Sequence, residues 1–331
     1  MLKLGIIGTG WISAQFVEAA MLTGNYTLSA VYSRTLVNAE KFAANLSVGG
    51  VEIFDDLTVF VAADLDVIYI ASPNSAHFEQ AKAVLSADKS VIVEKPAFSN
   101  PHELTEIIQL ADKKQLFFFE AARNIHEAAF QTVKDFLADK TIVGADLTYA
   151  KYSSKMPALL AGELPNKWNP AMSGGILADL GVYLLYFSLG IFGKPEAVSY
   201  DAQLLPTGVD VSGTGLLDYA DFTMTMKAAG NFTSYLPSEI YTTDGTLILD
   251  GISAISEAIF VSHDGVKETL DIPATADNPL FEEAGDFAAI LSAGDLTGKN
   301  FQSWQALAKA VSETSLAMRQ DAGIIFAADK K

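Results

Sequence analysis

Hydrophobic positions in the first 120 residues alternate between two patterns, continuous β-branched runs and runs with helical spacing. Continuous runs predict strands at residues 2–7, 26–32, 51–54, 67–71, 91–93 and 116–119. Helical spacing between them predicts helices at about 12–20, 39–46, 76–87 and 104–111. Strands that alternate with helices indicate a doubly wound parallel sheet with right-handed crossovers. We therefore expect an amino-terminal Rossmann α/β domain over residues 1–122.

The pattern changes after residue 123. A helix at about 128–137 and a strand at about 145–152 precede a long apolar helix over 176–192. Short β-like runs follow at 197–205, 215–226, 231–236, 246–249, 258–262 and 267–270, and then two helices at about 281–292 and 302–319. The pattern favours a second α/β domain over residues 123–331, with a mostly antiparallel sheet and one major helix packed on it.

Composition excludes several classes of protein. Half of the 331 residues are hydrophobic, which excludes disorder, and a net charge of −18 argues against nucleic acid or an anionic membrane as partner. The chain has no cysteine, and its four histidines lack ligand spacing, so we expect no metal site. The apolar run at 176–192 contains Asp179 and is short for a membrane span, and the first apolar run is short for a signal peptide. We expect a cytoplasmic protein.

A glycine-rich turn joins the first predicted strand to the first predicted helix. Its residues are Gly8, Thr9, Gly10, Trp11, Ile12 and Ser13. Glycines allow a tight turn and a close approach of the backbone to a pyrophosphate, which then lies at the positive end of the following helix. Ser13 stands where the third glycine of the usual motif would be, and it is small enough to permit helix-to-strand packing. The turn predicts dinucleotide binding by residues 8–12.

The end of the second strand bears on the choice between NAD and NADP. NAD-binding folds usually carry an acidic residue there for the ribose 2′-hydroxyl. This chain instead has Tyr32, Ser33, Arg34 and Thr35. Ser33 and Arg34 could bind a 2′-phosphate, so we expect NADP to be preferred over NAD. The alternative is that Arg34 is a solvated residue at a helix start.

Polar residues follow the fourth and fifth predicted strands. The first group is Ser72, Pro73, Asn74 and His77, and the second is Glu94, Lys95 and Pro96. Adjacent parallel strands present their carboxyl ends at one edge of the sheet, where ligands bind. Pro96 has no backbone donor and should end the strand. Both groups are therefore candidates for cofactor binding, although Lys95 alone could be a solvated strand end and His77 a helix-start residue bonded to backbone.

The long apolar helix of the second domain begins with Gly174 and Gly175 and carries two unexpected polar residues. Asp179 and Tyr183 are four positions apart, so they project from one face of a helix. A buried aspartate needs a partner, and we expect a cation from the other domain. The alternatives are that Asp179 is a cap or a buried acceptor and that Tyr183 belongs to the core.

Taken together, these stretches resemble the glucose-fructose oxidoreductase, inositol dehydrogenase and rhizopine-catabolism (Gfo/Idh/MocA) family of NAD(P)-dependent oxidoreductases. The resemblance implies a second domain with an open-faced sheet, often used for oligomerisation, and hence a homodimer or homotetramer. It also implies that Lys95 and Asp179 lie near the nicotinamide. Tyr183, where many members have histidine, resembles the branch with glucose-fructose oxidoreductase, dimeric dihydrodiol dehydrogenase and xylose dehydrogenase. The segment 120–126 departs from that branch; its Arg123 is a candidate cofactor contact.

These residues suggest reversible hydride transfer between the cofactor and a secondary alcohol of a sugar, cyclic polyol or dihydrodiol. Tyr183 would be the acid/base, Lys95 would favour its phenolate, and Asp179 would position Lys95 or a substrate hydroxyl. Further substrate contacts are expected from Tyr152, Trp168 and Asn169, in addition to Lys95, Asp179 and Tyr183. Two alternatives are a non-catalytic NAD(P)-sensing regulator and an intramolecular oxidoreductase or glycosidase with tightly held cofactor.

Overall fold

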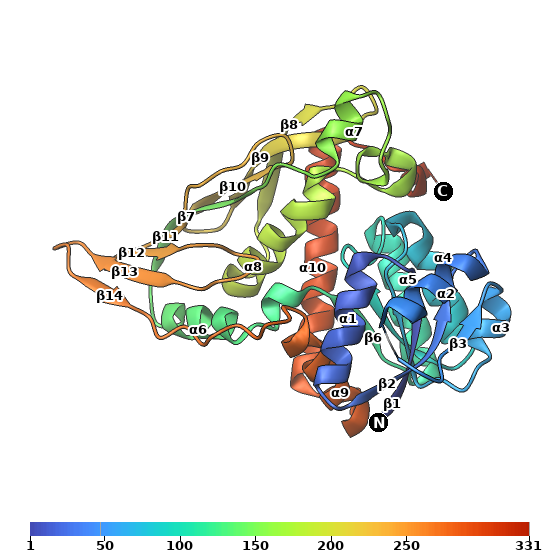
Figure 1. The fold of residues 1–331 in the computed structure, drawn as a ribbon. Coiled ribbons are helices and arrows are strands. Elements are labelled where there is room, and N and C mark those ends of the chain that lie inside the picture. The colour runs from blue at the N-terminus through green and yellow to red at the C-terminus, as the bar shows by residue number, and fades with distance from the viewer. Residues whose placement is uncertain (47, 331) are drawn as a thin grey trace. The chain divides into compact units, whose positions relative to one another are not determined.

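The chain forms two compact units in a computed structural model that describes residues 1–46 and 48–330 (Figure 1). Unit 1 contains Met1–Ala121 and Ala276–Ala306, and unit 2 contains the remainder. The first boundary coincides with the expected one near residue 122. The return of Ala276–Ala306 to unit 1 corrects the expectation that residues 123–331 form a single domain.

The returning segment completes the hydrophobic core of unit 1. The Phe119 ring stacks on Phe287 at a centroid distance of 4.7 Å and meets Phe301 edge-on at 5.4 Å. The Tyr26 hydroxyl donates a hydrogen bond of 2.9 Å to the Ala284 carbonyl. Helical periodicity shows which side of a helix is apolar but not which sheet that side covers, so the sequence pattern could not assign this segment.

Unit 1 is built around a six-stranded parallel sheet with the order β3-β2-β1-β4-β5-β6, which confirms the doubly wound prediction. Its strands are β1 (Leu2–Ile7), β2 (Tyr26–Tyr32), β3 (Glu52–Phe54), β4 (Val67–Ile70), β5 (Ser90–Glu94) and β6 (Phe118–Ala121). Its helices are α1 (Trp11–Leu22), α2 (Leu36–Leu46), α3 (Leu57–Val61), α4 (Asn74–Ser86), α5 (Pro101–Lys114), α9 (Phe281–Ala293) and the first residues of α10 (Lys299–Asp321). The strand order reverses at β1, and in such sheets ligands bind at the carboxyl ends of the strands beside the reversal.

Unit 2 contains an eight-stranded sheet with the order β14-β13-β12-β11-β7-β10-β9-β8. Among the described strands of this sheet, only β7 and β10 pair in parallel, so the sheet is mostly antiparallel, as predicted. Its strands are β7 (Ile142–Ala150), β8 (Ala197–Leu204), β9 (Asp210–Asp218), β10 (Thr223–Ala229), β11 (Ser238–Thr242), β12 (Gly245–Leu249), β13 (Ala258–Ser262) and β14 (Lys267–Thr269). Its helices are α6 (Ala128–Leu137), α7 (Met156–Leu160), α8 (Val182–Phe192) and the rest of α10, with short turns η1 (Arg123–Ile125), η2 (Asn166–Trp168), η3 (Pro170–Met172), η4 (Leu177–Gly181) and η5 (Ala327–Lys330).

Two predicted strands of unit 2 are wrong. The run at 215–226 is a hairpin of β9 and β10, closed where the Tyr219 N–H donates 2.9 Å to the Phe222 carbonyl. Its turn has neither glycine nor proline, and the weaker turn signal of Asp218 and Asp221 was not recognised. The run at 231–236 is irregular, and the strand begins only at Ser238, after Pro237, which has no backbone donor.

The segment Pro170–Phe192 contains a window of 18 residues with a mean hydropathy of 1.8, so it is long enough and apolar enough to pass for a membrane span. However, 72% of that window is buried inside the structure. Leu184, Leu185 and Phe187 are fully buried in α8. Burial, more than length, therefore identifies this segment as a core helix of unit 2.

Candidate active site

The glycine turn after β1 has space for a ligand. Gly8 has a φ of +101°, and a Cβ atom there would lie 2.5 Å from the Ala71 carbonyl oxygen, so only glycine fits. Gly10 caps α1, and a Cβ atom there would meet nothing within 4 Å. Trp11 is 75% exposed, whereas Ser13, in place of the third glycine, is fully buried. Open space at a helix N-terminus fits the pyrophosphate of a dinucleotide. The other residues assigned to this turn, Thr9 and Ile12, are half-buried.

The residues expected to select the cofactor follow β2. Ser33 is half-buried, and its N–H donates 3.1 Å to the Phe54 carbonyl on the neighbouring strand. Arg34 is exposed and has no ion pair with the residues that the structure describes. Its guanidinium is thus available to a ligand at the carboxyl edge of the sheet.

His77 connects the loops that follow β4 and β5. Its side chain is 1% exposed, with Nδ1 3.1 Å from the Ala97 carbonyl and Nε2 2.8 Å from the Ser72 carbonyl. Glu120, on β6, accepts a hydrogen bond of 3.0 Å from the Ala97 N–H. Burial lowers the pKa of His77, although the backbone carbonyls oppose that shift. His77 therefore links these two loops through backbone carbonyls, as in the backbone-bonded alternative considered above, and its contact with cofactor stays a prediction. Pro73 and Asn74 form the start of α4 in the same loop.

Glu94 holds the backbone of Lys95. Its carboxylate is buried at the end of β5, where it accepts a hydrogen bond from the Tyr69 hydroxyl and another of 3.2 Å from the Lys95 N–H. The Tyr69 ring stacks on Phe16 of α1 at 3.8 Å. The peptide bond from Lys95 to Pro96 is cis. Tyr69 was not singled out in the sequence, although a tyrosine in a fully buried strand needs a partner for its hydroxyl.

The two glycines before the apolar helix are required by close backbone contacts. A Cβ atom on Gly174 would lie 2.4 Å from the Lys167 carbonyl oxygen. Gly175 has a φ of +126°, and a Cβ atom there would lie 2.3 Å from Oδ1 of Asp210. The pair thus allows the loop and Asp210 to approach the start of the helix.

Asp210 caps the start of that helix. Its carboxylate accepts hydrogen bonds of 3.0 Å from the Ile176 N–H, 2.7 Å from the Leu177 N–H and 2.7 Å from the Tyr200 hydroxyl. Burial raises the pKa of Asp210, and these hydrogen bonds oppose the shift. This residue was missed in the sequence because it comes from β9, more than 30 residues away from the helix that it caps.

The expected helix over 176–192 is present, but its first part is a π-helical turn, so Asp179 and Tyr183 do not share a regular α-helix. Asp179 lies in the π-helical turn η4, and Tyr183 lies in the first turn of α8. A Cβ atom on Gly181 would lie 2.8 Å from a Leu177 methyl group, so this turn also depends on glycine. Single π-helical turns within helices occur frequently at functional sites.

Asp179 forms an ion pair with Lys167 of the same unit. The side chains are 38% and 20% exposed, respectively. The Lys167 ammonium also lies 5.2 Å from the centroid of the Trp168 ring. The expected partner was a cation from the other domain, so Lys167 is a residue that sequence reasoning missed. The signal for it is weak: a lysine in the loop that leads to the glycine pair.

The three loop residues proposed to contact substrate have different environments. Tyr152 is 46% exposed. Asn169 accepts a hydrogen bond of 2.9 Å from the Ala171 N–H and so closes the turn η3. Trp168 is fully buried, and its Nε1 has no hydrogen-bond partner in the described chain. Trp168 therefore supports the loop from inside in this structure, while contact of Tyr152 and Asn169 with substrate stays a prediction.

Tyr183 lies in a cluster that includes Arg123. The Tyr149 ring meets the Tyr183 ring edge-on at 5.7 Å, and the central carbon of the Arg123 guanidinium lies 5.9 Å from the Tyr183 ring centroid. Arg123 is also paired with Glu127 at 3.0 Å. The structure therefore brings Arg123, predicted as a cofactor contact, together with the predicted acid/base.

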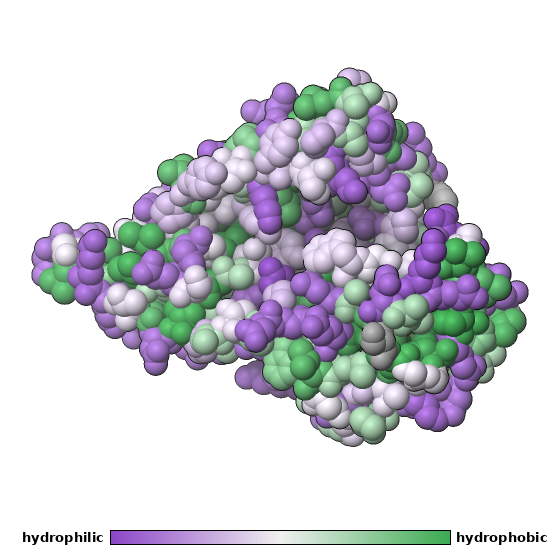
Figure 2. Space-filling view, in the orientation of Figure 1, coloured by the Kyte–Doolittle hydropathy of each residue, from purple (hydrophilic) through white to green (hydrophobic). Residues whose placement is uncertain are grey.

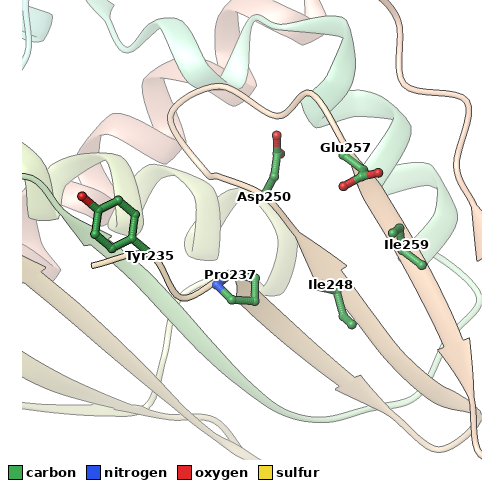
Figure 3. A pocket seen from close by; sticks show the side chains of 6 residues that line it. All are labelled: Tyr235, Pro237, Ile248, Asp250, Glu257 and Ile259. Atoms are coloured by element: carbon green, nitrogen blue, oxygen red, sulfur yellow. The ribbon is translucent and has the colours of Figure 1, made fainter. Parts of the chain in front are cut away.

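Unit 2 also has a surface pocket (Figure 3). Its volume is about 260 Å³, and it is lined by Tyr235, Pro237, Ile248, Asp250, Glu257 and Ile259. None of the predicted site residues lines it. In the described chain, no group of three or more histidine, aspartate or glutamate side chains could hold a metal ion.

Two family models match the chain. The model for the oxidoreductase family GFO_IDH_MocA with its NAD-binding Rossmann fold covers residues 2–122, and the GFO/IDH/MocA carboxyl-terminal domain covers 130–248. Among curated proteins, an uncharacterized oxidoreductase of Escherichia coli, YgjR, is 36% identical over 331 residues, with 99% of each chain covered. The scyllo-inositol 2-dehydrogenase (NADP(+)) IolU of Bacillus subtilis is 34% identical over 334 residues, with 100% of each covered.

More distant similarity extends to other dehydrogenases and to solved structures. The human trans-1,2-dihydrobenzene-1,2-diol dehydrogenase is 28% identical over 73% of this chain and 70% of its own. A 3-ketoreductase from Actinomadura kijaniata, solved with NADP and TDP-benzene, has a TM-score of 0.83 at 19% identity, with 97% of each chain covered. That structural likeness shows the fold alone.

Proposed function

Because this chain belongs to the Gfo/Idh/MocA family of NAD(P)-dependent oxidoreductases, we propose that it catalyses reversible NADP-linked oxidation of a secondary alcohol on a cyclic polyol or sugar. The observation that carries the substrate class is the 34% identity, from end to end, with a scyllo-inositol 2-dehydrogenase that uses NADP. The dihydrodiol dehydrogenases, which match over part of the chain, also act on a ring carbinol, as their name states.

The residues of unit 1 fit the cofactor. The turn at Gly8 and Gly10 would hold the pyrophosphate at the N-terminus of α1, and Ser33 and Arg34 would hold the ribose end. Lys95 would lie near the reacting ring, on a backbone fixed by Glu94. When bound, the nicotinamide supplies hydride acceptance from a carbinol carbon, or donation to a carbonyl carbon.

The residues of this chain would accept and donate the proton of the substrate hydroxyl. In oxidation the alcohol loses its hydride from carbon and its proton from oxygen, and Tyr183 would accept that proton as a phenolate. Free tyrosine, with a pKa of about 10, is a weak base near neutral pH, so a nearby cation is needed. Lys95 would supply that charge and would polarise the carbonyl in reduction. Asp179, paired with Lys167, would orient a substrate hydroxyl.

A substitution at Arg34 tests the preference for NADP. Replacing Arg34 by glutamine should raise KM for NADP about 10- to 100-fold, because a hydrogen bond to a charged group contributes about 1.5–3 kcal/mol. KM for NAD should stay unchanged, since NAD lacks the 2′-phosphate. Steady-state kinetics with both cofactors would measure the split. Equal changes for the two cofactors would contradict the assignment of Arg34 to the 2′-phosphate.

The proposed activity can be tested by screening inositols, aldoses and dihydrodiols with NADP and NAD while following reduced nicotinamide. We expect turnover with NADP on a ring secondary alcohol. Tight binding of NADP without turnover on any of these would contradict the dehydrogenase proposal and favour a non-catalytic sensor. Cofactor that stays bound through gel filtration would favour the intramolecular oxidoreductase or glycosidase.

We also propose that the chain forms a homodimer or homotetramer through the sheet of unit 2. Figure 1 shows α6 and α8 on one side of this sheet. Strand register places a row of half-buried and exposed side chains on the open side, at Leu216, Thr225, Asp146, Glu239, Ile248 and Ile259. Figure 2 shows hydrophobic groups interspersed with hydrophilic ones over β12 and β13. We also propose a cytoplasmic location, which the absence of cysteine fits.

Light scattering tests this assembly. The native protein should have two or four times the chain mass of 35.4 kDa, and the double change Ile248→Asp with Ile259→Asp should reduce that mass, because it places charges in an apolar contact. A native monomer, or a variant of unchanged mass, would rule this surface out as the interface.

A further inference from the structure

We propose that Arg123, held in place by Glu127, is a positioning residue that stabilises the phenolate form of Tyr183. The inference rests on the proposed function, in which Tyr183 exchanges a proton with substrate. It gives Arg123 a role different from the cofactor contact that the sequence suggested, and it adds Glu127 to the residues on which proton transfer depends.

The guanidinium is fixed by its contacts. Arg123 begins η1, directly after the chain enters unit 2, and Glu127 lies four residues later, at the start of α6. Their side chains are 18% and 4% exposed and meet at 3.0 Å from Nη1 to Oε1. A charge pair that is this buried holds its geometry, because loss of either partner would leave an uncompensated charge. Arg123 therefore has little freedom to turn away from Tyr183.

The same segment also holds the backbone of Tyr183. The side-chain amide of Asn124 donates 3.2 Å to the Tyr183 carbonyl and 3.3 Å to the Ile252 carbonyl. Asn124 is 2% exposed. Consecutive residues of η1 therefore hold the backbone of Tyr183 and place a cation beside its side chain.

The charge of Arg123 acts on the Tyr183 hydroxyl. The central carbon of the guanidinium lies 5.9 Å from the centroid of the Tyr183 ring, and the rings of Tyr183 and Tyr149 pack edge-on beside it. Burial alone would lower the pKa of Arg123, but negative charge on Tyr183, Glu127 and Tyr149 raises it above its ordinary value. The coupling is mutual, so a guanidinium stabilised by a tyrosinate stabilises that tyrosinate. The titratable groups that the structure places around this guanidinium are Tyr183, Glu127 and Tyr149.

Arg123 is suited to this task in a way that lysine is not. A guanidinium stays charged at every pH at which the enzyme works, and its planar donors can bond Glu127 and Tyr183 together. Lys95 is proposed to act on the substrate oxygen as well as on the phenolate. Arg123 would thus supply a constant positive charge to Tyr183 from within unit 2.

The test is the titration of Tyr183 in the protein without cofactor or substrate. The near-ultraviolet absorbance of tyrosinate would be followed against pH in the wild type and in Arg123→Gln, each with and without Tyr183→Phe. Subtracting the curve measured with Tyr183→Phe from the curve measured without it leaves the titration of Tyr183 alone. We expect its midpoint to rise by about one pH unit or more in Arg123→Gln, since a neighbouring opposite charge shifts such a group by about 1–3 units. The midpoint in Arg123→Lys should lie between those of the wild type and Arg123→Gln.

A control variant separates this role from a general effect of losing one positive charge. Lys309→Gln removes the same charge from the exposed surface of α10 and should leave the Tyr183 titration where it is in the wild type. With an active substrate, the acidic limb of the pH profile of kcat should move upward in Arg123→Gln by the same amount as the titration.

Three results would overturn the proposal: an unchanged midpoint in Arg123→Gln, an equal change in Lys309→Gln, or no titration of wild-type Tyr183 below about pH 12, two units above free tyrosine. If no substrate is turned over, the titration still decides the inference. The failure of the proposed function and the failure of this inference are thus distinguishable.

Discussion

Tyr183→Phe should lower kcat about 10²- to 10⁴-fold, the range that a positioned acid or base contributes. The change removes only the hydroxyl that would take up the substrate proton. The ring keeps its edge-on contact with Tyr149 at 5.7 Å, and the Tyr183 carbonyl keeps its bond from Asn124, so the fold should be unaffected. Steady-state kinetics on the best substrate of the screen would measure kcat, and circular dichroism would confirm the fold.

Tyr235→Phe is the matched control for this prediction. It removes the same hydroxyl from a side chain of unit 2 that is 94% exposed and that is not among the proposed site residues. Its kcat should equal that of the wild type. Wild-type kcat in Tyr183→Phe, measured with the true substrate, would show that another group transfers the proton.

Lys95→Met is expected to reduce kcat about 10²- to 10³-fold, as does the loss of one preorganised group that stabilises developing charge. Methionine fills similar space without the ammonium. The backbone at this position is fixed independently of the side chain, because the Lys95 N–H donates to Glu94, which also accepts from Tyr69. The loss should therefore reflect the charge, and NADP binding measured by fluorescence should change much less than kcat.

Lys82→Met controls for the loss of a lysine in the same unit. Lys82 is 46% exposed and pairs with Glu106 on the outside of the helices, where such a pair contributes little. If Lys95→Met instead weakened NADP binding as strongly as it lowered kcat, Lys95 would be a cofactor anchor and not part of the proton-transfer machinery.

The Rossmann half of the fold could be predicted from local patterns. Its strands are continuous apolar runs, and most of them are followed by a run with helical spacing, so topology follows from order along the chain. The glycine turn could be predicted as well, because its glycines stand between a strand pattern and a helix pattern. The structure adds the reason for Gly8, which is its close approach to the Ala71 carbonyl. The second unit could be predicted only as a mostly antiparallel sheet, since the turn at Tyr219 has no glycine or proline and the pairing of β7 with β10 joins distant segments.

The partners of the candidate site residues could not be predicted. Lys167 meets Asp179, and Asp210 caps the helix that carries Tyr183, through contacts that depend on how loops and strands pack. Periodicity identifies the buried side of an element but not the residue that faces it. Arg123 shows the consequence: the sequence made it a candidate cofactor contact, and the fold of unit 2 places it beside Tyr183.

Direct hydride transfer from substrate to cofactor is the central claim, and isotope transfer tests it most directly. The best secondary alcohol of the screen, deuterated at its carbinol carbon, would be oxidised with NADP, and the reduced cofactor would be analysed by NMR and mass spectrometry. The proposed function predicts one deuterium on the nicotinamide ring of each reduced cofactor. Reduced cofactor without deuterium, or NADP that binds but is never reduced, would contradict it.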